Sequence, residues 1–362
     1  MVVDDPGYAG RFASTGTKKC VDIVVPTMDA IVLAGGFATR LWPITRNRPK
    51  MFLPIGDTTV IDRIFRELEA DDRIEDVYVS TNKEFADEFR DHLADSPFEK
   101  PTVSVEEARA EDEKFGVVGA LGELVEREGI DDDTIVIAGD NLISFDLSTF
   151  IDAFEDNGGP TIAAYDVGDL ESATQYGVID VEDNRVVAFE EKPDDPPSTL
   201  VSIACYAFPA ETVGLFDTYL SGDNNPDEPG WFIEWLIDRE PVYAFPFEGA
   251  WFDIGTPDGY LDAVSWYLDG GTLVHPEATV EASDLGENVH VMEGATVVDS
   301  KLERSVVFPD ATLERCRVVS SLVDEETELE DVSLSNAQIG AHTSLTQTPP
   351  DTWVWEQHRD SE

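Results

Sequence analysis

Between residues 29 and 265 the chain alternates short apolar runs with amphipathic stretches. A short apolar run bounded by turn residues predicts a buried strand, and apolar positions at helical spacing predict a helix packed on a sheet. Their alternation is typical of an α/β domain with a mostly parallel sheet, which binds ligands at the carboxyl ends of its strands. The predicted strands are 30–34, 76–80, 102–106, 134–138, 161–166, 186–190 and 200–207, and the predicted helices are 59–70, 83–94, 117–127, 147–156, 210–220, 231–238 and 257–268.

From about residue 272 the pattern changes to a repeat of 16 residues. The segments 295–310, 311–326 and 327–342 align without a gap, and Leu, Val and Ile recur in three rows. Three short faces per turn, each stacked on its copy in the next coil, are typical of a parallel β-helix. The predicted inward rows are Val297, Leu313, Leu329 and Leu345; Leu302, Val318 and Leu334; and Val307, Val323 and Ile339.

The chain is strongly acidic, with 76 acidic and 24 basic residues and a formal net charge of −52. We expect neither nucleic acids nor anionic membranes as partners, because both would be repelled. The acidity is typical of a halophile's cytoplasm, where strong salt screens the self-repulsion. A surface for a cationic partner is the alternative, but the acids are spread along the whole chain. The three cysteines, Cys20, Cys205 and Cys316, are too far apart to indicate a disulfide framework or a zinc site.

Residues 34–54 read AGGFATRLWPITRNRPKMFLP and directly follow a buried strand. Two adjacent glycines let backbone N–H groups approach a phosphate or a nucleobase without a side chain in the way. Four cations follow, clustered where a polyphosphate would lie. The order matches neither a P-loop nor a dinucleotide-binding loop, so it predicts another kind of phosphate site. Its candidate residues are Gly35, Gly36, Arg40, Arg46, Arg48 and Lys50.

The order AGG-x-x-TRL-x-P-x-T-x-x-x-PK-x-x-x-P resembles the signature of the sugar-1-phosphate nucleotidyltransferases, also called NDP-sugar pyrophosphorylases. The resemblance implies a Rossmann-like catalytic domain followed by a left-handed β-helix. It implies that Gly35 and Gly36 bind the nucleotide, and that Arg40 and Lys50 are the catalytic cations at its phosphates. Ala38 departs from the family, which more often has Gly there, and its methyl group narrows the allowed backbone conformations.

Two carboxylates follow predicted strands or turns where a metal ion could lie beside a triphosphate. The predicted strand in Ile135–Asn141 leads into a Gly-Asp pair that contains Asp140. Asp253 lies in the segment GAWFDIGTP. Carboxylates at such positions can hold Mg²⁺. The resemblance to the family's Gly-Asp and W-x-D-x-G-T-P elements implies that Asp140 and Asp253 share one Mg²⁺. A helix cap is the alternative role for Asp253, but Thr256 suits the cap better.

Three further motifs resemble elements that contact the sugar and the base. FEEKP at 189–193 is similar to F-x-EKP, and Tyr176-Gly177-Val178 is similar to a Y-G-V element. The loop from Phe115 to Leu121 is a degenerate form of L-G-T-A-G-A-L, preceded by two glutamates. The resemblance implies that Gly177, Glu191 and Lys192 bind the sugar phosphate, and that Glu106, Glu107 and Gly116 lie near the nucleobase.

The implied reaction joins a nucleoside triphosphate and a hexose 1-phosphate into an NDP-sugar and pyrophosphate, with Mg²⁺. We expect glucose 1-phosphate with dTTP or UTP, and mannose 1-phosphate with GTP as the alternative. A non-catalytic regulatory subunit is disfavoured because the motif residues are intact. A second activity, acyl transfer by the β-helix, is disfavoured because the coils are few and contain no candidate catalytic histidine. All five histidines are interpreted as surface residues: His92, His275, His290, His342 and His358.

These interpretations divide the chain into four parts. The first lies upstream of the point where related enzymes usually begin, and it contains no apolar core of a signal peptide. The last is polar apart from two tryptophans, which either dock on a neighbour or fray. We expect a cytoplasmic homo-oligomer that associates through the β-helix or the catalytic domain. The parts are a disordered or mistranslated extension (1–28), a nucleotidyltransferase domain (29–270), a β-helix (271–348) and a tail (349–362).

Overall fold

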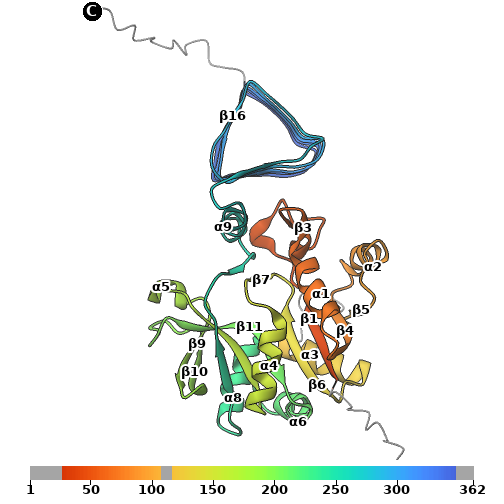
Figure 1. The fold of residues 1–362 in the computed structure, drawn as a ribbon, viewed down its shortest axis with the longest axis vertical. Coiled ribbons are helices and arrows are strands. Elements are labelled where there is room, and N and C mark those ends of the chain that lie inside the picture. Colours follow the sequence, from red (N-terminus) through yellow and green to blue (C-terminus); the bar gives the residue numbers. More distant parts are fainter. Residues whose placement is uncertain (1–26, 107–115, 348–362) are drawn as a thin grey trace, which may run out of the picture.

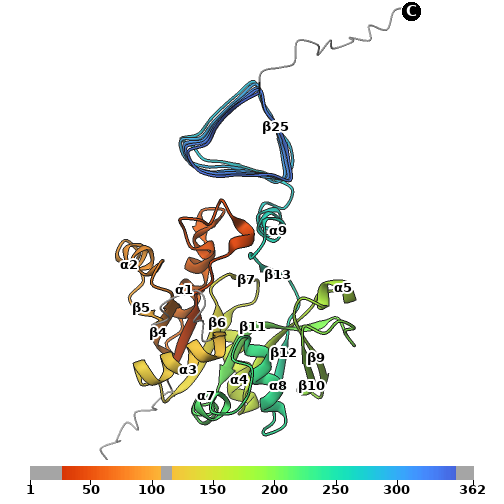
Figure 2. The ribbon, with the colours of Figure 1, turned by 180° about the vertical axis from the view of Figure 1, so that it is seen from behind.

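The computed structural model describes residues 27–106 and 116–347. The predicted tail and almost all of the predicted extension lie outside this range, although Met28 is buried and begins the first strand. The described chain forms an α/β domain and a β-helix of triangular cross-section, with α9 between them (Figures 1 and 2). In the described part of the chain, no helix is long and apolar enough to cross a membrane.

A nine-stranded sheet forms the centre of the α/β domain, in the order β5-β4-β1-β6-β11-β8-β12-β10-β9. Its first four strands are parallel, as predicted, whereas β11 runs antiparallel to both β6 and β8. The sheet is therefore mixed in its second half. Its strands are β1 (Met28–Leu33), β4 (Ile74–Thr81), β5 (Pro101–Val105), β6 (Asp133–Ala138), β8 (Thr161–Asp166), β9 (Gly177–Glu182), β10 (Arg185–Glu191), β11 (Leu200–Phe208) and β12 (Tyr243–Pro246).

Helices cover both faces of this sheet and bury its alternating apolar side chains in two clusters. One cluster contains Phe65, Phe89 and Phe150 from α1, α2 and α4, and the other contains Leu121 and Phe232 from α3 and α8. The helices are α1 (Val60–Ala70), α2 (Ala86–Ala94), α3 (Gly116–Glu128), α4 (Leu147–Asn157), α5 (Leu170–Ala173), α6 (Ala210–Val213), α7 (Phe216–Leu220), α8 (Pro229–Ile237) and α9 (Pro257–Leu268).

Every predicted strand and helix of this domain is present, with boundaries shifted by a few residues. The predicted helix 210–220 is two short helices, α6 and α7, separated by Gly214. The sequence analysis missed two strands of the main sheet, β9 and β12, and two short pairings. Those pairings join β2 (Pro54–Ile55) to β3 (Thr58–Thr59) and β7 (Asn141–Ile143) to β13 (Trp251–Asp253).

The β-helix has three parallel sheets, and most of its coils are offset by 16 residues, as predicted. The first coil is one residue longer, because Thr272 pairs with Val289. The strands of the whole β-helix are β14 (Thr272–Val274), β15 (Thr279–Glu281), β16 (Asp284–Leu285), β17 (Val289–Val291), β18 (Thr296–Val298), β19 (Lys301–Glu303), β20 (Ser305–Val307), β21 (Thr312–Glu314), β22 (Arg317–Val319), β23 (Leu322–Val323), β24 (Glu328–Glu330), β25 (Ser333–Ser335), β26 (Gln338–Ile339) and β27 (Ser344–Thr346).

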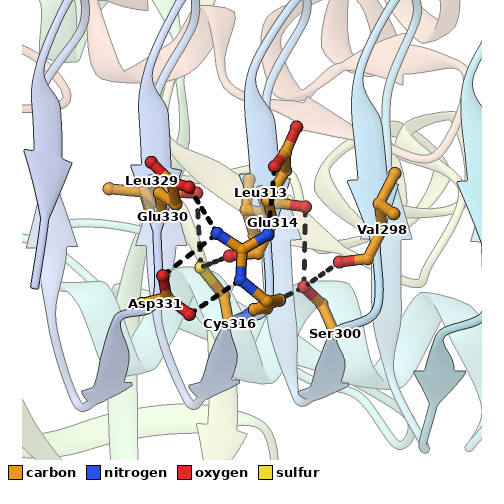
Figure 3. A network of polar contacts seen from close by, with 9 residues as sticks. Val298, Ser300, Leu313, Glu314, Cys316, Leu329, Glu330 and Asp331 are labelled. Carbon is orange, nitrogen blue, oxygen red and sulfur yellow. Dashed lines mark hydrogen bonds and ion pairs between the residues drawn. The ribbon is translucent and has the colours of Figure 1, made fainter. Parts of the chain in front are cut away.

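The predicted inward rows are buried in the middle coils and become more exposed at the C-terminal end. Val297 and Leu313 have no exposed surface, whereas Leu345 is 40% exposed because no described coil covers it. The corners turn through residues with positive φ, such as Asp310 and Glu326. Inside one corner the Ser300 hydroxyl donates to Val298 O (2.7 Å) and accepts from the Cys316 N–H (2.9 Å), which links neighbouring coils (Figure 3).

Candidate active site

A cavity of 1520 Å³ lies at the carboxyl ends of the parallel strands, beyond Leu33, Ala138 and the residue after β4, Asn82. This is where open α/β sheets bind ligands, and the volume exceeds the roughly 300–1,000 Å³ of a pocket for one small ligand. The cavity can therefore hold two substrates. Eleven of the residues assigned by sequence line it: Gly35, Gly36, Arg40, Lys50, Glu106, Gly116, Asp140, Gly177, Glu191, Lys192 and Asp253.

Residues 34–50, called the nucleotide loop below, leave β1 and form one wall of this cavity. Its backbone is fixed by the buried Thr45, whose hydroxyl donates to Ala38 O at 3.0 Å. Ala38 itself is left-handed, with φ 47° and ψ 46°. Glycine adopts this conformation without a steric cost, which is a physical reason for the family's preference for glycine at this position.

The structure brings the two predicted metal ligands together through the small β7–β13 ladder. Asp253 pairs with Asn141, the neighbour of Asp140, so the two carboxylates lie side by side. Burial, and then repulsion by Asp140, raise the pKa of Asp253. Lys50 Nζ contacts Asp140 Oδ2, and a Cβ placed on Gly255 would lie 3.4 Å from Arg40 Nη2 and 3.0 Å from Asp253 Oδ1. Two carboxylates and two cations thus meet at one point.

This donor set fits Mg²⁺, which proteins commonly hold through one or two carboxylates together with substrate phosphates. Repulsion between Asp140 and Asp253 is relieved by any cation placed between them. No group of three or more His, Cys, Asp or Glu side chains suited to a metal occurs in the ranges 27–106 and 116–347, so the pair would rely on substrate oxygens. Thr256 caps α9 by accepting from the Gly259 N–H at 3.1 Å, which leaves Asp253 free of that role.

The sugar-side residues meet because the strands β9 and β10 pair antiparallel. This pairing places Gly177 opposite Glu191, whose carboxylate also lies against Gly230 at the start of α8. Burial raises the pKa of Glu191, partly offset by Lys192. Lys192 has φ 48°, and its Nζ contacts Glu228 and lies 3.7 Å from Glu191 Oε1. A buried carboxylate and an adjacent exposed ammonium group therefore face the cavity together.

The base-side residues Glu106 and Gly116 also line the cavity. The Glu106 carboxylate covers Gly35, where an added Cβ would lie 2.6 Å from Oε1. Gly116 has φ 72° and packs so closely on Pro226 that an added Cβ would lie 2.2 Å from its carbonyl oxygen. Close backbone packing therefore requires this glycine, whatever its contact with a nucleotide. Glu107 lies outside the described residues.

Three sequence interpretations need correction. Arg46 and Arg48 do not line the cavity, and Arg48 instead pairs with Asp324 of the β-helix, with Nη2 and Oδ1 2.6 Å apart. His290 is buried in β17, not a surface residue. His92 is half-buried, because it stacks on Phe52 and its Nε2 lies 2.6 Å from Asp62 Oδ1. His358 lies outside the described residues.

Sequence reasoning missed several residues that shape the cavity. Asn82 donates from Nδ2 to Gly35 O at 2.9 Å and accepts from the Glu84 N–H, so it ties the nucleotide loop to the end of β4. Its position directly after a predicted strand was the available signal. Glu228 was also missed. It directly precedes Pro229 at the start of α8, and an acidic residue at that position is usually interpreted as stabilising the N-terminus of the helix.

Comparisons with known proteins identify the family of the chain. A family model described as nucleotidyl transferase matches residues 29–270. A putative mannose-1-phosphate guanyltransferase from Sulfolobus acidocaldarius is 29% identical over 288 residues, with 75% of each chain covered. The low-salt glycan biosynthesis nucleotidyltransferase Agl11 from Haloferax volcanii is 27% identical, covering 70% of this chain and 71% of that protein.

A solved structure shows the same fold. The crystal structure of a putative glucose-1-phosphate thymidylyltransferase from Bacillus anthracis has a TM-score of 0.58 at 26% identity, covering 67% of this chain and 95% of that one. The matched curated relatives differ in length, and this chain spans between 55% and 75% of them. The chain belongs to the nucleotidyl transferase family. Within that family it is one of the sugar-1-phosphate nucleotidyltransferases.

Proposed function

We propose that the protein transfers a nucleotidyl group from a nucleoside triphosphate to a hexose 1-phosphate, with Mg²⁺. The observation that carries this proposal is the convergence of Arg40, Lys50, Asp140, Lys192 and Asp253 on one cavity large enough for both substrates. A phosphate oxygen of the sugar phosphate attacks the α-phosphorus, and the bond to the β-phosphate breaks. The products are an NDP-sugar and pyrophosphate. The nucleophile is already an anion, so no strong general base is needed.

The residues act by positioning and by neutralising charge. Arg40 holds the β- and γ-phosphates that leave, and Lys50 neutralises the α-phosphate. Lys192 orients the attacking phosphate, while Glu191 and the Gly177 backbone bind the sugar. Asp140 and Asp253 would hold Mg²⁺, which would supply positive charge beside the phosphates. The carboxylates of Asp140 and Glu228 hold the ammonium groups of Lys50 and Lys192, respectively, at the cavity.

The identity of the substrates is a separate step of the proposal. The first candidate is glucose 1-phosphate with dTTP or UTP. The second candidate is GTP with mannose 1-phosphate, and Glu106 favours its nucleotide, because a carboxylate only accepts hydrogen bonds. The Watson–Crick edge of guanine offers two adjacent N–H donors, whereas thymine and uracil offer one donor flanked by carbonyl oxygens. A carboxylate over Gly35 therefore matches guanine better.

A panel of five nucleoside triphosphates against four hexose 1-phosphates would test this proposal. The reaction would be followed by pyrophosphate release in molar KCl with Mg²⁺. We expect one pair to exceed the others by at least roughly tenfold in kcat/KM, the discrimination that about 1.4 kcal/mol of transition-state binding provides. Turnover of no pair by folded protein would contradict the proposed activity.

We also propose a halophilic, cytoplasmic origin and a homo-oligomer. The net charge of −52 requires screening, and a relative occurs in Haloferax volcanii. Raising KCl from 0.1 M to 2 M should therefore increase the melting temperature, because the Debye length falls from about 10 Å to below 3 Å. Light scattering in the same salt would give the oligomeric state, and a mass of 39.9 kDa would contradict the oligomer.

A further inference from the structure

One face of the nucleotide loop lines the cavity, and the other packs against the β-helix. Leu41 and Ile44 have almost no exposed surface, and they belong to one hydrophobic cluster with Val306, Phe308 and Leu322 of the β-helix. The cluster also contains α9, which lies between the two domains in Figures 1 and 2. The loop that lines the cavity is thus also a main contact of the second domain.

An ion pair anchors the end of this loop to the β-helix. Arg48 Nη2 lies 2.6 Å from Asp324 Oδ1, and the Asp324 side chain is only 2% exposed. The Glu325 N–H also donates to Oδ1 at 2.9 Å, so the acceptor is held by its own coil. The Arg48 guanidinium lies over the Phe308 ring, with Cζ 5.1 Å from the centroid. A cation held by a buried carboxylate and an aromatic face has little freedom to move.

The same loop also touches a further coil of the β-helix. A Cβ added to Gly340 would lie 2.8 Å from Pro43 Cβ, so the loop backbone and this coil approach closely. In sequence, the two kinds of contact alternate. Arg40 lines the cavity and Leu41 is in the interface, while Arg48 is in the interface and Lys50, two residues later, lines the cavity.

From this alternation we propose that the β-helix positions the phosphate-binding cations of the active site, with Arg48 and Asp324 as positioning residues. The inference rests on the proposed function for its kinetic consequence. Lys50 begins a short 3-10 turn directly after Pro49, so the backbone between Arg48 and Lys50 has few free torsions. A shift of Arg48 therefore displaces Lys50 from the α-phosphate. A misplacement of about 1 Å at such a position can cost a factor of roughly 100 in rate.

The test uses the full chain in molar KCl and compares Asp324→Asn with Arg304→Met. The control breaks another interdomain ion pair, in which Arg304 Nη2 lies 2.7 Å from Asp262 Oδ1 of α9, but it does not contact the nucleotide loop. We expect Asp324→Asn to lower kcat about tenfold or more, with KM for both substrates changed less than about threefold. We expect Arg304→Met to change kcat less than about twofold.

Hydrogen exchange provides a readout that needs no substrate, so it separates this inference from the proposed activity. Asp324→Asn should increase exchange in residues 39–52, and Arg304→Met should not. If Asp324→Asn does not fold, the double variant Arg48→Met with Asp324→Leu replaces the pair by apolar groups, a change that often leaves stability intact. It carries the same kinetic and exchange expectations. Unchanged kcat and exchange in the folded variant, or equal effects of Arg304→Met, would overturn the proposal.

Discussion

Cations are paired with carboxylates both in the cavity and on the β-helix, but the two regions surround these pairs differently. On the β-helix, Lys301 lies 2.8 Å from Asp284, and both side chains are more than half exposed. In the cavity, Lys50 contacts Asp140, and each side chain is about 15% exposed. An exposed pair contributes roughly 0–1 kcal/mol to stability and is screened by salt. A pair sheltered from water interacts more strongly with any phosphate that enters. Lys50 thus differs from Lys301 in its surroundings, not in having a carboxylate partner.

The largest effect should come from removing the sheltered cation. Lys50→Ala should lower kcat by roughly 100- to 1,000-fold, because removing one charge-stabilising group at a transition state costs roughly 2.7–4 kcal/mol. Substrates should still bind, since Arg40 and Lys192 remain. The matched variant Lys301→Ala should keep kcat within about twofold. Pyrophosphate release measures kcat of both variants. Equal values would contradict the expected difference between Lys50 and Lys301.

The second prediction contrasts two carboxylates. Asp253→Asn should abolish most Mg²⁺-dependent turnover yet raise the melting temperature at pH 7. Burial and Asp140 raise the pKa of Asp253, so the ionised side chain disfavours the folded state above that pKa. The gain in stability should therefore shrink as pH falls toward about 4, where the ordinary aspartate is protonated. Calorimetry across pH gives this profile.

The matched variant is Asp284→Asn, at an exposed β-helix carboxylate paired with Lys301. It should change neither turnover nor its dependence on Mg²⁺. A lower melting temperature for Asp253→Asn at pH 7 would show that the sheltered carboxylate stabilises the fold instead of straining it.

The third prediction concerns nucleotide choice. Glu106→Gln should shift preference from GTP toward dTTP or UTP by roughly tenfold to 100-fold in relative kcat/KM, because an amide can both donate and accept. Glu314→Gln on the β-helix should leave the preference unchanged. Relative rates with competing nucleotides measure the shift, and an unaltered ratio for Glu106→Gln would remove Glu106 from base recognition.

The smallest effect compares two left-handed residues. Ala38 in the nucleotide loop and Asn336 at a β-helix corner have φ 47° and 52°. Alanine bears a cost of roughly 1–2 kcal/mol in this conformation, whereas asparagine tolerates it better. Ala38→Gly should therefore raise the melting temperature by about 1–4 °C. Asn336→Gly should raise the melting temperature less. A larger increase for Asn336→Gly than for Ala38→Gly in calorimetry would contradict backbone strain at Ala38.

The repeat and the strand–helix alternation allowed most of the fold to be predicted, because apolar spacing follows the geometry of each element. Burial of Val297 and Leu313 follows directly from the 16-residue period. Strand β12 (Tyr243–Pro246) was missed because its four residues are too few to show a period. The split at Gly214 was missed because the apolar pattern continues across it.

Proximity of distant side chains was harder to predict. The motifs placed Asp140 and Asp253 near one metal only through the family resemblance, whereas the ladder of β7 and β13 provides the physical cause. Arg48 was grouped with the phosphate cations because it is close to Lys50 in sequence. Its partner Asp324 lies 276 residues away, and no local pattern reports such a contact.

The central claim is that one cavity holds both substrates and joins them. Product analysis by phosphorus NMR tests it most directly, with wild-type protein, Mg²⁺, a nucleoside triphosphate and a hexose 1-phosphate in molar KCl. We expect NDP-sugar and pyrophosphate in equal amounts, only when both substrates and Mg²⁺ are present. Release of nucleoside monophosphate without sugar transfer, or no turnover of any pair by folded protein, would contradict it.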